Sequence, residues 1–129
     1  MPKIILDTNF LLIPIQFNVD IFAELDRINP NNAEICVLDL TMQELNKIKE
    51  TGNTQDKTAA KVATGLIKQK HLKVVRSSFK NSVDDTIVET AQKGDFVATQ
   101  DKGLKQKLKA KKIGIITLKD KSHLIIEEK

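Results

Sequence analysis

Ile4-Ile5-Leu6-Asp7-Thr8-Asn9 is the stretch that decides the fold of this chain. Its three bulky apolar residues run without a polar interruption, which is typical of a strand buried on both faces of a parallel sheet. The run then ends at a carboxylate followed by two further polar side chains. Because ligands bind beyond the carboxyl ends of the strands in open parallel sheets, this stretch predicts a buried strand and a candidate binding edge.

The rest of the chain alternates short apolar runs with longer segments of helical spacing. Helical crossovers between strands imply a mainly parallel sheet that is covered by helices on both faces. We therefore expect one domain over residues 1–129, a three-layer α/β/α sandwich. Strands are predicted at residues 4–6, 35–38, 72–75, 96–99 and 113–118, with 123–126 as a candidate edge strand. Helices are predicted at residues 20–28, 41–50, 56–69, 83–92 and 102–112.

Composition narrows the class of protein. The chain has 129 residues, of which 40% are apolar and 29% charged, which is typical of a globular domain. Its single cysteine, Cys36, excludes an internal disulfide. No apolar run approaches the ~20 residues of a membrane span, and the N-terminal apolar run is too short for a signal peptide. We therefore expect a cytoplasmic protein without a membrane partner.

Charge is distributed unevenly within the net charge of +4. The first 56 residues carry more acidic than basic side chains, and the remainder is rich in lysine. A concentration of positive charge attracts polyanions such as nucleic acids, although a solvated lysine-rich surface has the same composition. The candidate RNA-binding lysines are Lys57, Lys61, Lys102 and Lys105.

Acidic side chains follow the first four predicted strands, and together they form a candidate site. Carboxylates gathered at one sheet edge repel one another, which favours a bound cation. Oxygen ligands without histidine or cysteine suit Mg²⁺ or Mn²⁺. Such an ion activates water and stabilises phosphoryl oxygens, so the pattern predicts phosphodiester hydrolysis. The acidic residues are Asp7, Glu44, the pair Asp84 and Asp85, and Asp101.

Each of these acids also has a local structural explanation. Thr41-x-x-Glu44 fits a capping box, in which the glutamate bonds to the first turn of a helix. Ser82-x-x-Asp85 places a carboxylate where the helix dipole favours it. Asp101 suits the N-cap position of the next helix. These alternatives remain open at the level of sequence.

Four segments together resemble the PIN-domain ribonucleases. They are Ile5-Leu6-Asp7-Thr8-Asn9, Gln43-Glu44-Leu45, Val83-Asp84-Asp85-Thr86-Ile87-Val88 and Val97-Ala98-Thr99-Gln100-Asp101-Lys102-Gly103-Leu104-Lys105. The last two segments are most similar to archaeal and eukaryotic PIN proteins of pre-ribosomal RNA processing. VapC-type toxin ribonucleases share the same domain.

The resemblance implies a five-stranded sheet in the order 3-2-1-4-5 with an acidic Mg²⁺ or Mn²⁺ site. By position in the motifs, the catalytic acids are expected to be Asp7, Glu44, Asp85 and Asp101. Asp7, Asp85 and Asp101 are the expected metal ligands, and Asp84 is either a further ligand or a second charge at the helix start. The residues expected to support the acids are Thr8, Asn9 and Thr99.

The function implied by the resemblance is metal-dependent hydrolysis of RNA, with ribosomal RNA processing as the first expectation. The alternatives are a VapC-type toxin of a toxin–antitoxin pair and a PIN module that binds RNA without cleaving it. The expected partners are RNA, a second copy of the chain in a homodimer, and an antitoxin or a ribosome-assembly protein.

Overall fold

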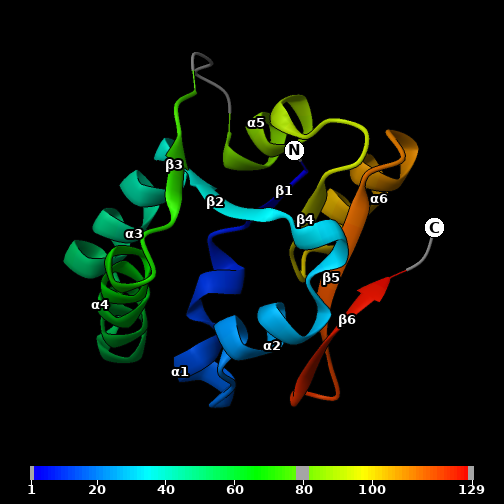
Figure 1. The fold of residues 1–129 in the computed structure, drawn as a ribbon. Helices are drawn as coiled ribbons and strands as arrows, with labels where there is room; N and C mark the ends of the chain where they lie inside the picture. The colour runs from blue at the N-terminus through cyan, green and yellow to red at the C-terminus, as the bar shows by residue number, and fades with distance from the viewer. Residues whose placement is uncertain (1, 78–81, 128–129) are drawn as a thin grey trace.

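A computed structural model describes residues 2–77 and 82–127 (Figure 1). Within these residues, one sheet has the strand order β3-β2-β1-β4-β5-β6. Neighbouring strands from β3 to β5 are parallel, and β6 runs antiparallel to β5. The strands are β1 (Lys3–Leu6), β2 (Glu34–Leu38), β3 (Lys73–Val75), β4 (Phe96–Ala98), β5 (Gly114–Lys119) and β6 (His123–Glu127).

Helices connect the parallel strands as crossovers. None of those in the described part of the chain is long and apolar enough to cross a membrane. The α-helices are α1 (Ile13–Phe17), α2 (Ile21–Ile28), α3 (Asp39–Thr51), α4 (Thr54–Gln69), α5 (Val83–Thr90) and α6 (Lys102–Ala110). Two short 3₁₀ helices, η1 (Asn9–Leu12) and η2 (Pro30–Asn32), complete the connections.

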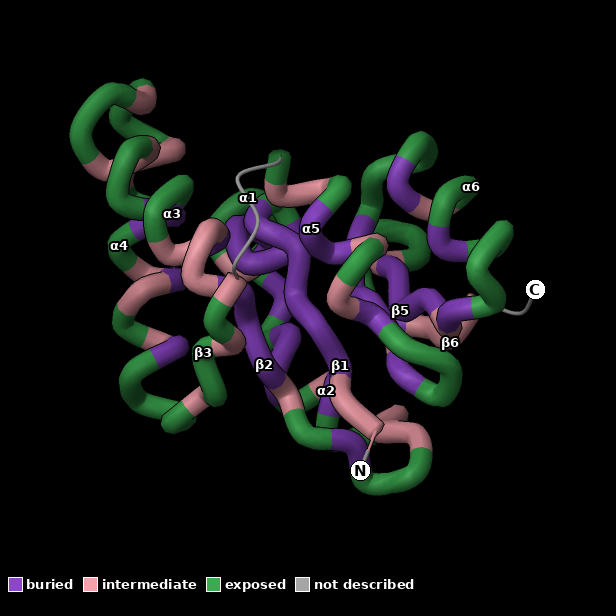
Figure 2. Tube along the Cα trace, turned by 90° about the horizontal axis from the view of Figure 1, so that it is seen from above, coloured by how far each residue is buried: buried purple, intermediate pink, exposed green. Residues whose placement is uncertain are grey.

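Two apolar cores lie on opposite faces of the sheet, and together they make three layers. On one face, Ile4 and Leu6 of β1 pack in a core with residues of α1 to α4. On the other face, Ile5 packs in a second core with residues of α5 and α6. This alternation follows from the two-residue period of a strand. Figure 2 shows the buried residues along β1 and β2 at the centre and exposed segments on the outer helices.

The predicted three-layer sandwich and the order of its first five strands are confirmed. The candidate edge strand at residues 123–126 is present as β6, and it extends the five-stranded sheet by one antiparallel strand. Hydrogen bonds hold β6 to α2, since the Leu124 amide donates to Glu24 and the Arg27 guanidinium donates to the Leu124 carbonyl. This edge is therefore fixed by contacts that are distant in sequence.

Two features were not predicted from the sequence. Residues 9–17 form η1 and α1, where Phe10, Leu11 and Leu12 follow one another and are all buried. Consecutive apolar residues have no helical period, so the pattern gave no signal. The helix expected at residues 41–50 begins two residues earlier, at Asp39, whose carboxylate accepts hydrogen bonds from the Leu40 and Ser77 amides.

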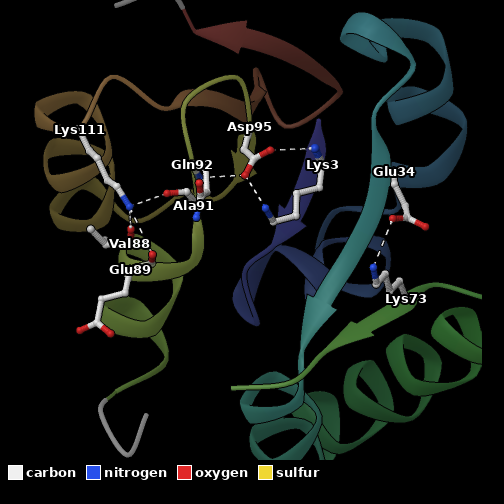
Figure 3. Close-up of polar contacts among 9 residues, drawn as sticks. All are labelled: Lys3, Glu34, Lys73, Val88, Glu89, Ala91, Gln92, Asp95 and Lys111. Carbon is white, nitrogen blue, oxygen red and sulfur yellow. Dashed lines mark hydrogen bonds and ion pairs between the residues drawn. The ribbon is translucent and has the colours of Figure 1, made fainter. Parts of the chain in front are cut away.

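A buried carboxylate joins the starts of β1 and β4 at the amino-terminal edge of the sheet (Figure 3). Asp95 accepts hydrogen bonds from the backbone amides of Lys3 and Gln92, at 3.0 and 2.9 Å. The Lys3 ammonium forms an ion pair with the same carboxylate at 2.6 Å. Although burial acts to raise it, the pKa of Asp95 is held below its ordinary value by Lys3 and the two amides.

We predict that Asp95→Asn lowers the free energy of unfolding at pH 7 by about 1.5–3 kcal/mol, because buried donors lose a charged acceptor. Since the pKa of Asp95 is lowered by folding, the stabilisation is present above the unfolded pKa and is lost as the pH falls through the folded pKa. Urea denaturation at pH 7 and pH 3 measures both effects. Asp26→Asn, on the exposed side of α2, is the control and should change stability by less than about 0.5 kcal/mol.

Candidate functional site

Asp7 lies directly after β1, at the carboxyl edge of the sheet, and it is only 4% exposed. Its backbone amide donates to the Ala98 carbonyl, so the pairing of β1 with β4 continues to this residue. One carboxylate oxygen accepts a hydrogen bond from the Thr8 amide at 2.8 Å. The other accepts from the Thr99 hydroxyl, also at 2.8 Å. The backbone and these two donors therefore fix the carboxylate in place.

The Thr99 hydroxyl connects two of the predicted acids. It donates to the Asp7 carboxylate and accepts a hydrogen bond from the Asp101 backbone amide at 3.1 Å. Thr99 is fully buried, one residue beyond the end of β4. Thr99 was expected to support the acids, and its hydroxyl contacts both Asp7 and Asp101.

Burial makes the Asp7 carboxylate electrostatically unusual. The pKa of Asp7 is raised from 3.8 to about 6, first by burial and further by the negative charges of Asp84 and Glu44. The hydrogen bonds from Thr99 and Thr8 act in the opposite direction. No lysine or arginine in the described ranges forms an ion pair with Asp7, Glu44, Asp84 or Asp101. The cluster thus holds negative charge that no basic side chain pairs.

The two acids at the start of α5 have different surroundings. Asp84 is partly buried, and its pKa is raised by burial and then by the charges of Asp101 and Glu44. Asp85 is exposed and pairs with the Lys107 ammonium at 3.1 Å, which lowers the pKa of Asp85. Lys107 also acts on Asp84 and lowers its pKa, while the charge of Asp85 raises it. The two acids therefore differ in that Asp84 acts on Asp7, whereas Asp85 forms the ion pair with α6. The resemblance implied that Asp85 is a metal ligand and that Asp84 is either a further ligand or a second charge at the helix start, and the choice between the two stays a prediction.

The helical phase of α5 explains this difference. Successive residues of an α-helix are about 100° apart, and Val83 and Ile87 lie on the face that packs against the sheet. Asp85 falls on the opposite face of the helix, whereas Asp84 falls at the margin of the packed face. The apolar pattern of α5 was available in the sequence and is the signal that could have ranked the two acids.

Glu44 lies on the second turn of α3 and is exposed. Because α3 begins at Asp39, Thr41 lies inside the helix and cannot be the N-cap of a capping box. The Thr41 side chain is instead buried beside Thr8, with 3.4 Å between the two hydroxyl oxygens. The capping explanation for Glu44 is therefore wrong, and its charge acts on both Asp7 and Asp84.

Local helix capping involves two of the other acids, Asp101 and Asp85. Asp101 is the N-cap of α6 and accepts from the Leu104 amide at 2.8 Å. Ser82 caps α5 by accepting from the Asp85 amide, so the predicted Ser82-x-x-Asp85 pattern is present. Capping occupies one oxygen of Asp101, and its charge still acts on Asp84. Capping and membership of the cluster are thus compatible for Asp101.

The remaining supporting residues lie at the same edge. Thr8 is buried and links the end of β1 to Thr41 of α3, the helix that carries Glu44. Asn9 is exposed at the start of η1. Asp39 also follows a strand at this edge, but its two oxygens already accept from the Leu40 and Ser77 amides.

The four lysines predicted to bind RNA divide into two groups. Lys61 on α4 and Lys102 on α6 are exposed, and Lys57 on α4 is partly buried. Lys105 is engaged within the protein, because its ammonium donates to the Thr117 hydroxyl at 2.9 Å and lies 3.6 Å from the Glu127 carboxylate. Lys105 therefore serves to join α6 to β5 and β6.

The donor set suits a hard divalent cation in kind, since it consists of carboxylates with hydroxyl groups beside them. The charges of Glu44 and Asp101 raise the pKa of Asp84, and those of Asp84 and Glu44 raise the pKa of Asp7. Within residues 2–77 and 82–127, no three of the His, Cys, Asp and Glu side chains are gathered closely enough to hold one ion. The side chains thus share an edge and an electrostatic field without forming a closed coordination sphere.

We predict that Asp7→Asn stabilises the metal-free protein at pH 7.5 by about 1–3 kcal/mol, because it removes a buried charge. Since folding raises the pKa of Asp7, its ionisation destabilises the folded state above pH about 6, and the difference should vanish below pH about 4. Thermal unfolding in EDTA across this pH range measures the effect. Asp85→Asn should show no such gain, and a wild-type protein as stable as the variant at pH 7.5 would contradict the prediction.

Comparisons with known proteins identify the family of this chain. A family model described as a PIN like domain matches residues 4–121. Ribonuclease VapC4 of Methanocaldococcus jannaschii is 30% identical over 128 residues, which cover 98% of this chain and 97% of that protein. The structure of the PIN domain endonuclease Utp24 matches with a TM-score of 0.78 and 26% identity, covering 97% of this chain and 90% of the other. This chain therefore belongs to the PIN-domain family.

Proposed function

We propose that this protein is a divalent-metal-dependent ribonuclease that hydrolyses phosphodiester bonds of RNA. One observation carries the proposal: the pKa of the buried Asp7 carboxylate is raised to about 6 by burial and by neighbouring acids, and no basic side chain of residues 2–77 and 82–127 forms an ion pair with it. A divalent cation at this edge would relieve that repulsion. The similarity to Ribonuclease VapC4 and to the endonuclease Utp24 supports the same activity.

Each residue of the cluster has a distinct proposed role. Asp7, Asp84 and Asp101 would surround the metal, one or two of them directly and the rest through bound water, because Mg²⁺ usually keeps several waters and takes one or two carboxylates. Glu44 would orient the attacking water or ligate through it. Thr99 and Thr8 keep the Asp7 carboxylate in position through their hydrogen bonds. Asp85, which the motif suggested as a ligand, instead orients Lys107 at the rim of the site.

Mg²⁺ or Mn²⁺ would supply the positive charge that lowers the pKa of water and stabilises the phosphoryl oxygens. The protein's part is to hold the ion against the sheet edge and to leave the scissile phosphate accessible beside Glu44. Attack in line on the phosphorus would leave a 5′-phosphate and a 3′-hydroxyl. The exposed Lys61 and Lys102 would contact flanking phosphates, with Lys57 in a secondary position.

Two biological roles remain as proposals. Ribosomal RNA processing is favoured by the resemblance of the motifs around Asp84 and Asp101 to those of PIN proteins of pre-ribosomal RNA processing. A VapC-type toxin role is favoured by the similarity to Ribonuclease VapC4 along nearly the whole chain. Growth arrest on expression of the active protein, relieved by a protein encoded beside it, would favour the toxin role. Accumulation of precursor ribosomal RNA after depletion would favour the processing role.

Exchanging the neighbouring aspartates one at a time tests the assignment of the site. Asp84→Asn should reduce the rate of Mn²⁺-dependent cleavage of a labelled RNA by about 10–100-fold, because losses of this size are typical when residues around a metal site are changed. Asp85→Asn removes an exposed partner of Lys107 and should retain activity within a few-fold of the wild type. The measurement is the initial rate at saturating Mn²⁺, with circular dichroism as the check on folding.

Two outcomes would contradict these proposals separately. Loss of activity in Asp85→Asn with normal activity in Asp84→Asn would overturn the assignment of Asp84 while leaving a nuclease. Cleavage by the wild type that is unaffected by EDTA would overturn the dependence on a metal.

A further inference from the structure

Two hollows adjoin each other at the amino-terminal edge of the sheet, the end opposite to the acidic cluster. Their volumes are about 590 and 580 Å³, which fall within the ~300–1,000 Å³ of typical ligand pockets. Both are lined by Lys93, Gly94 and Asp95, so the turn that leads into β4 forms a wall that they share. We call the two hollows together the amino-edge groove.

Internal lysines hold the shared turn on both sides, as Figure 3 shows. The Lys111 ammonium donates to the Ala91 carbonyl, just before the turn. Lys3 forms an ion pair with Asp95, at the end of the turn. Lys93 therefore lies on a turn that is fixed by two other lysines. A groove with fixed walls avoids much of the entropy cost of ordering a binding site around its ligand.

The groove has positive charge that the protein does not neutralise. Lys93 and Lys112 are exposed, and neither forms an ion pair with any residue that the structure describes. The two acids of the walls are already compensated, since Asp95 lies 2.6 Å from Lys3 and Glu127 lies 3.6 and 3.9 Å from two lysines of α6. An anion that enters the groove therefore meets two ammonium groups without a competing acid.

One hollow of the groove also has an aromatic wall. Phe96 is partly exposed there, beside Ile126 of the edge strand β6. Its ring occupies the space over Gly114, the neighbouring residue on β5, where a Cβ atom would collide with the ring. An aromatic ring in a hollow with two unpaired lysines is suited to a nucleobase whose phosphates carry the negative charge.

The paired hollows favour a strand of RNA over other anions. Because the hollows share the wall that carries Lys93, two consecutive nucleotides can occupy them with their linking phosphate at this lysine. A free mononucleotide would fill only one of the two. An acidic protein segment would satisfy the lysines, but its aspartate and glutamate side chains have no ring to stack on Phe96.

We propose that the amino-edge groove is a second RNA-binding site, remote from the acidic cluster, with a base stacked on Phe96 and phosphates on Lys93 and Lys112. The site holds a flanking part of the RNA and takes no part in the chemistry. Asp95 and Thr99 lie at opposite ends of β4, about 13 Å apart at ~3.3 Å per residue, so only an RNA that extends beyond the cleavage site reaches the groove. The choice of RNA as the ligand rests on the proposed ribonuclease function.

Three substitutions test the proposal against a matched control. Lys93→Gln and Lys112→Gln each remove one positive charge from an exposed position. Phe96→Leu removes the aromatic ring but keeps an apolar side chain. Lys68→Gln is the control, because Lys68 is an exposed lysine of α4 that lines neither hollow. Binding of labelled oligoadenylate RNA is measured in EDTA by fluorescence anisotropy, with AMP and polyglutamate as competitors, and circular dichroism checks the fold.

Each lysine substitution should lower the slope of log affinity against log salt by about 0.7, the value for one phosphate contact on a single strand. Phe96→Leu should weaken binding by about 5-fold or more, because base stacking is lost. Lys68→Gln should keep the slope and affinity of the wild type. With Mn²⁺, the KM for a long RNA should rise in the groove variants at unchanged kcat, whereas cleavage of a short RNA should not change.

Failure of this inference is distinguishable from failure of the proposed function. If the wild type binds and cleaves RNA but both lysine variants equal Lys68→Gln, the groove is not an RNA site and the ribonuclease stands. Competition by AMP as effective as that by unlabelled RNA would assign the groove to a free nucleotide, and equal competition by polyglutamate would assign it to an acidic protein segment. Either result overturns the proposal. A wild type that cleaves no RNA, but whose RNA binding depends on these residues, would overturn the ribonuclease and support the groove.

Discussion

The hydrogen bond from the Thr99 hydroxyl to the Asp7 carboxylate joins the two central strands of the sheet where both end. The same hydroxyl accepts from the Asp101 amide, so one buried group positions two acids that are far apart in sequence. Burial of a carboxylate normally calls for a charged partner, and here the immediate donors are a hydroxyl and an amide. The pKa of Asp7 is raised because these two hydrogen bonds offset only part of the free-energy cost of burying its charge.

The opposite edge of the sheet provides a useful contrast. Asp95 is as little exposed as Asp7, but it lies less deep in the protein, and an ammonium and two backbone amides satisfy it, so that its pKa is lowered. The two aspartates thus differ both in depth and in whether a cation is supplied by the protein. The satisfied carboxylate serves as a structural clamp, and the unsatisfied one lies at the edge where ligands of parallel sheets bind. This difference in charge compensation separates a structural acid from a candidate catalytic one.

The lysines show that net charge alone is a poor guide to an RNA-binding surface. Lys105 joins α6 to the last two strands, and Lys107 pairs with Asp85, so both are engaged within the protein. Lys47 comes from the acidic part of the sequence, outside the lysine-rich segments, and lies one helical turn from Glu44 without an ion pair in the described residues. The function of a basic residue depends on which acceptor the fold places within its reach.

Sequence patterns alone determined the layers, the parallel sheet and the edge at which the acids meet, because the two-residue period of strands and the helical period are local properties of the chain. They also determined that Asp101 caps a helix, since capping depends on neighbours within one turn. The tertiary structure decided that Asp85 pairs with Lys107 while Asp84 acts on Asp7, that Glu44 does not cap, and which lysines are engaged by other side chains. The apolar pattern of α5 indicates which of its faces is packed, but the partners that each face meets depend on contacts between segments distant in sequence.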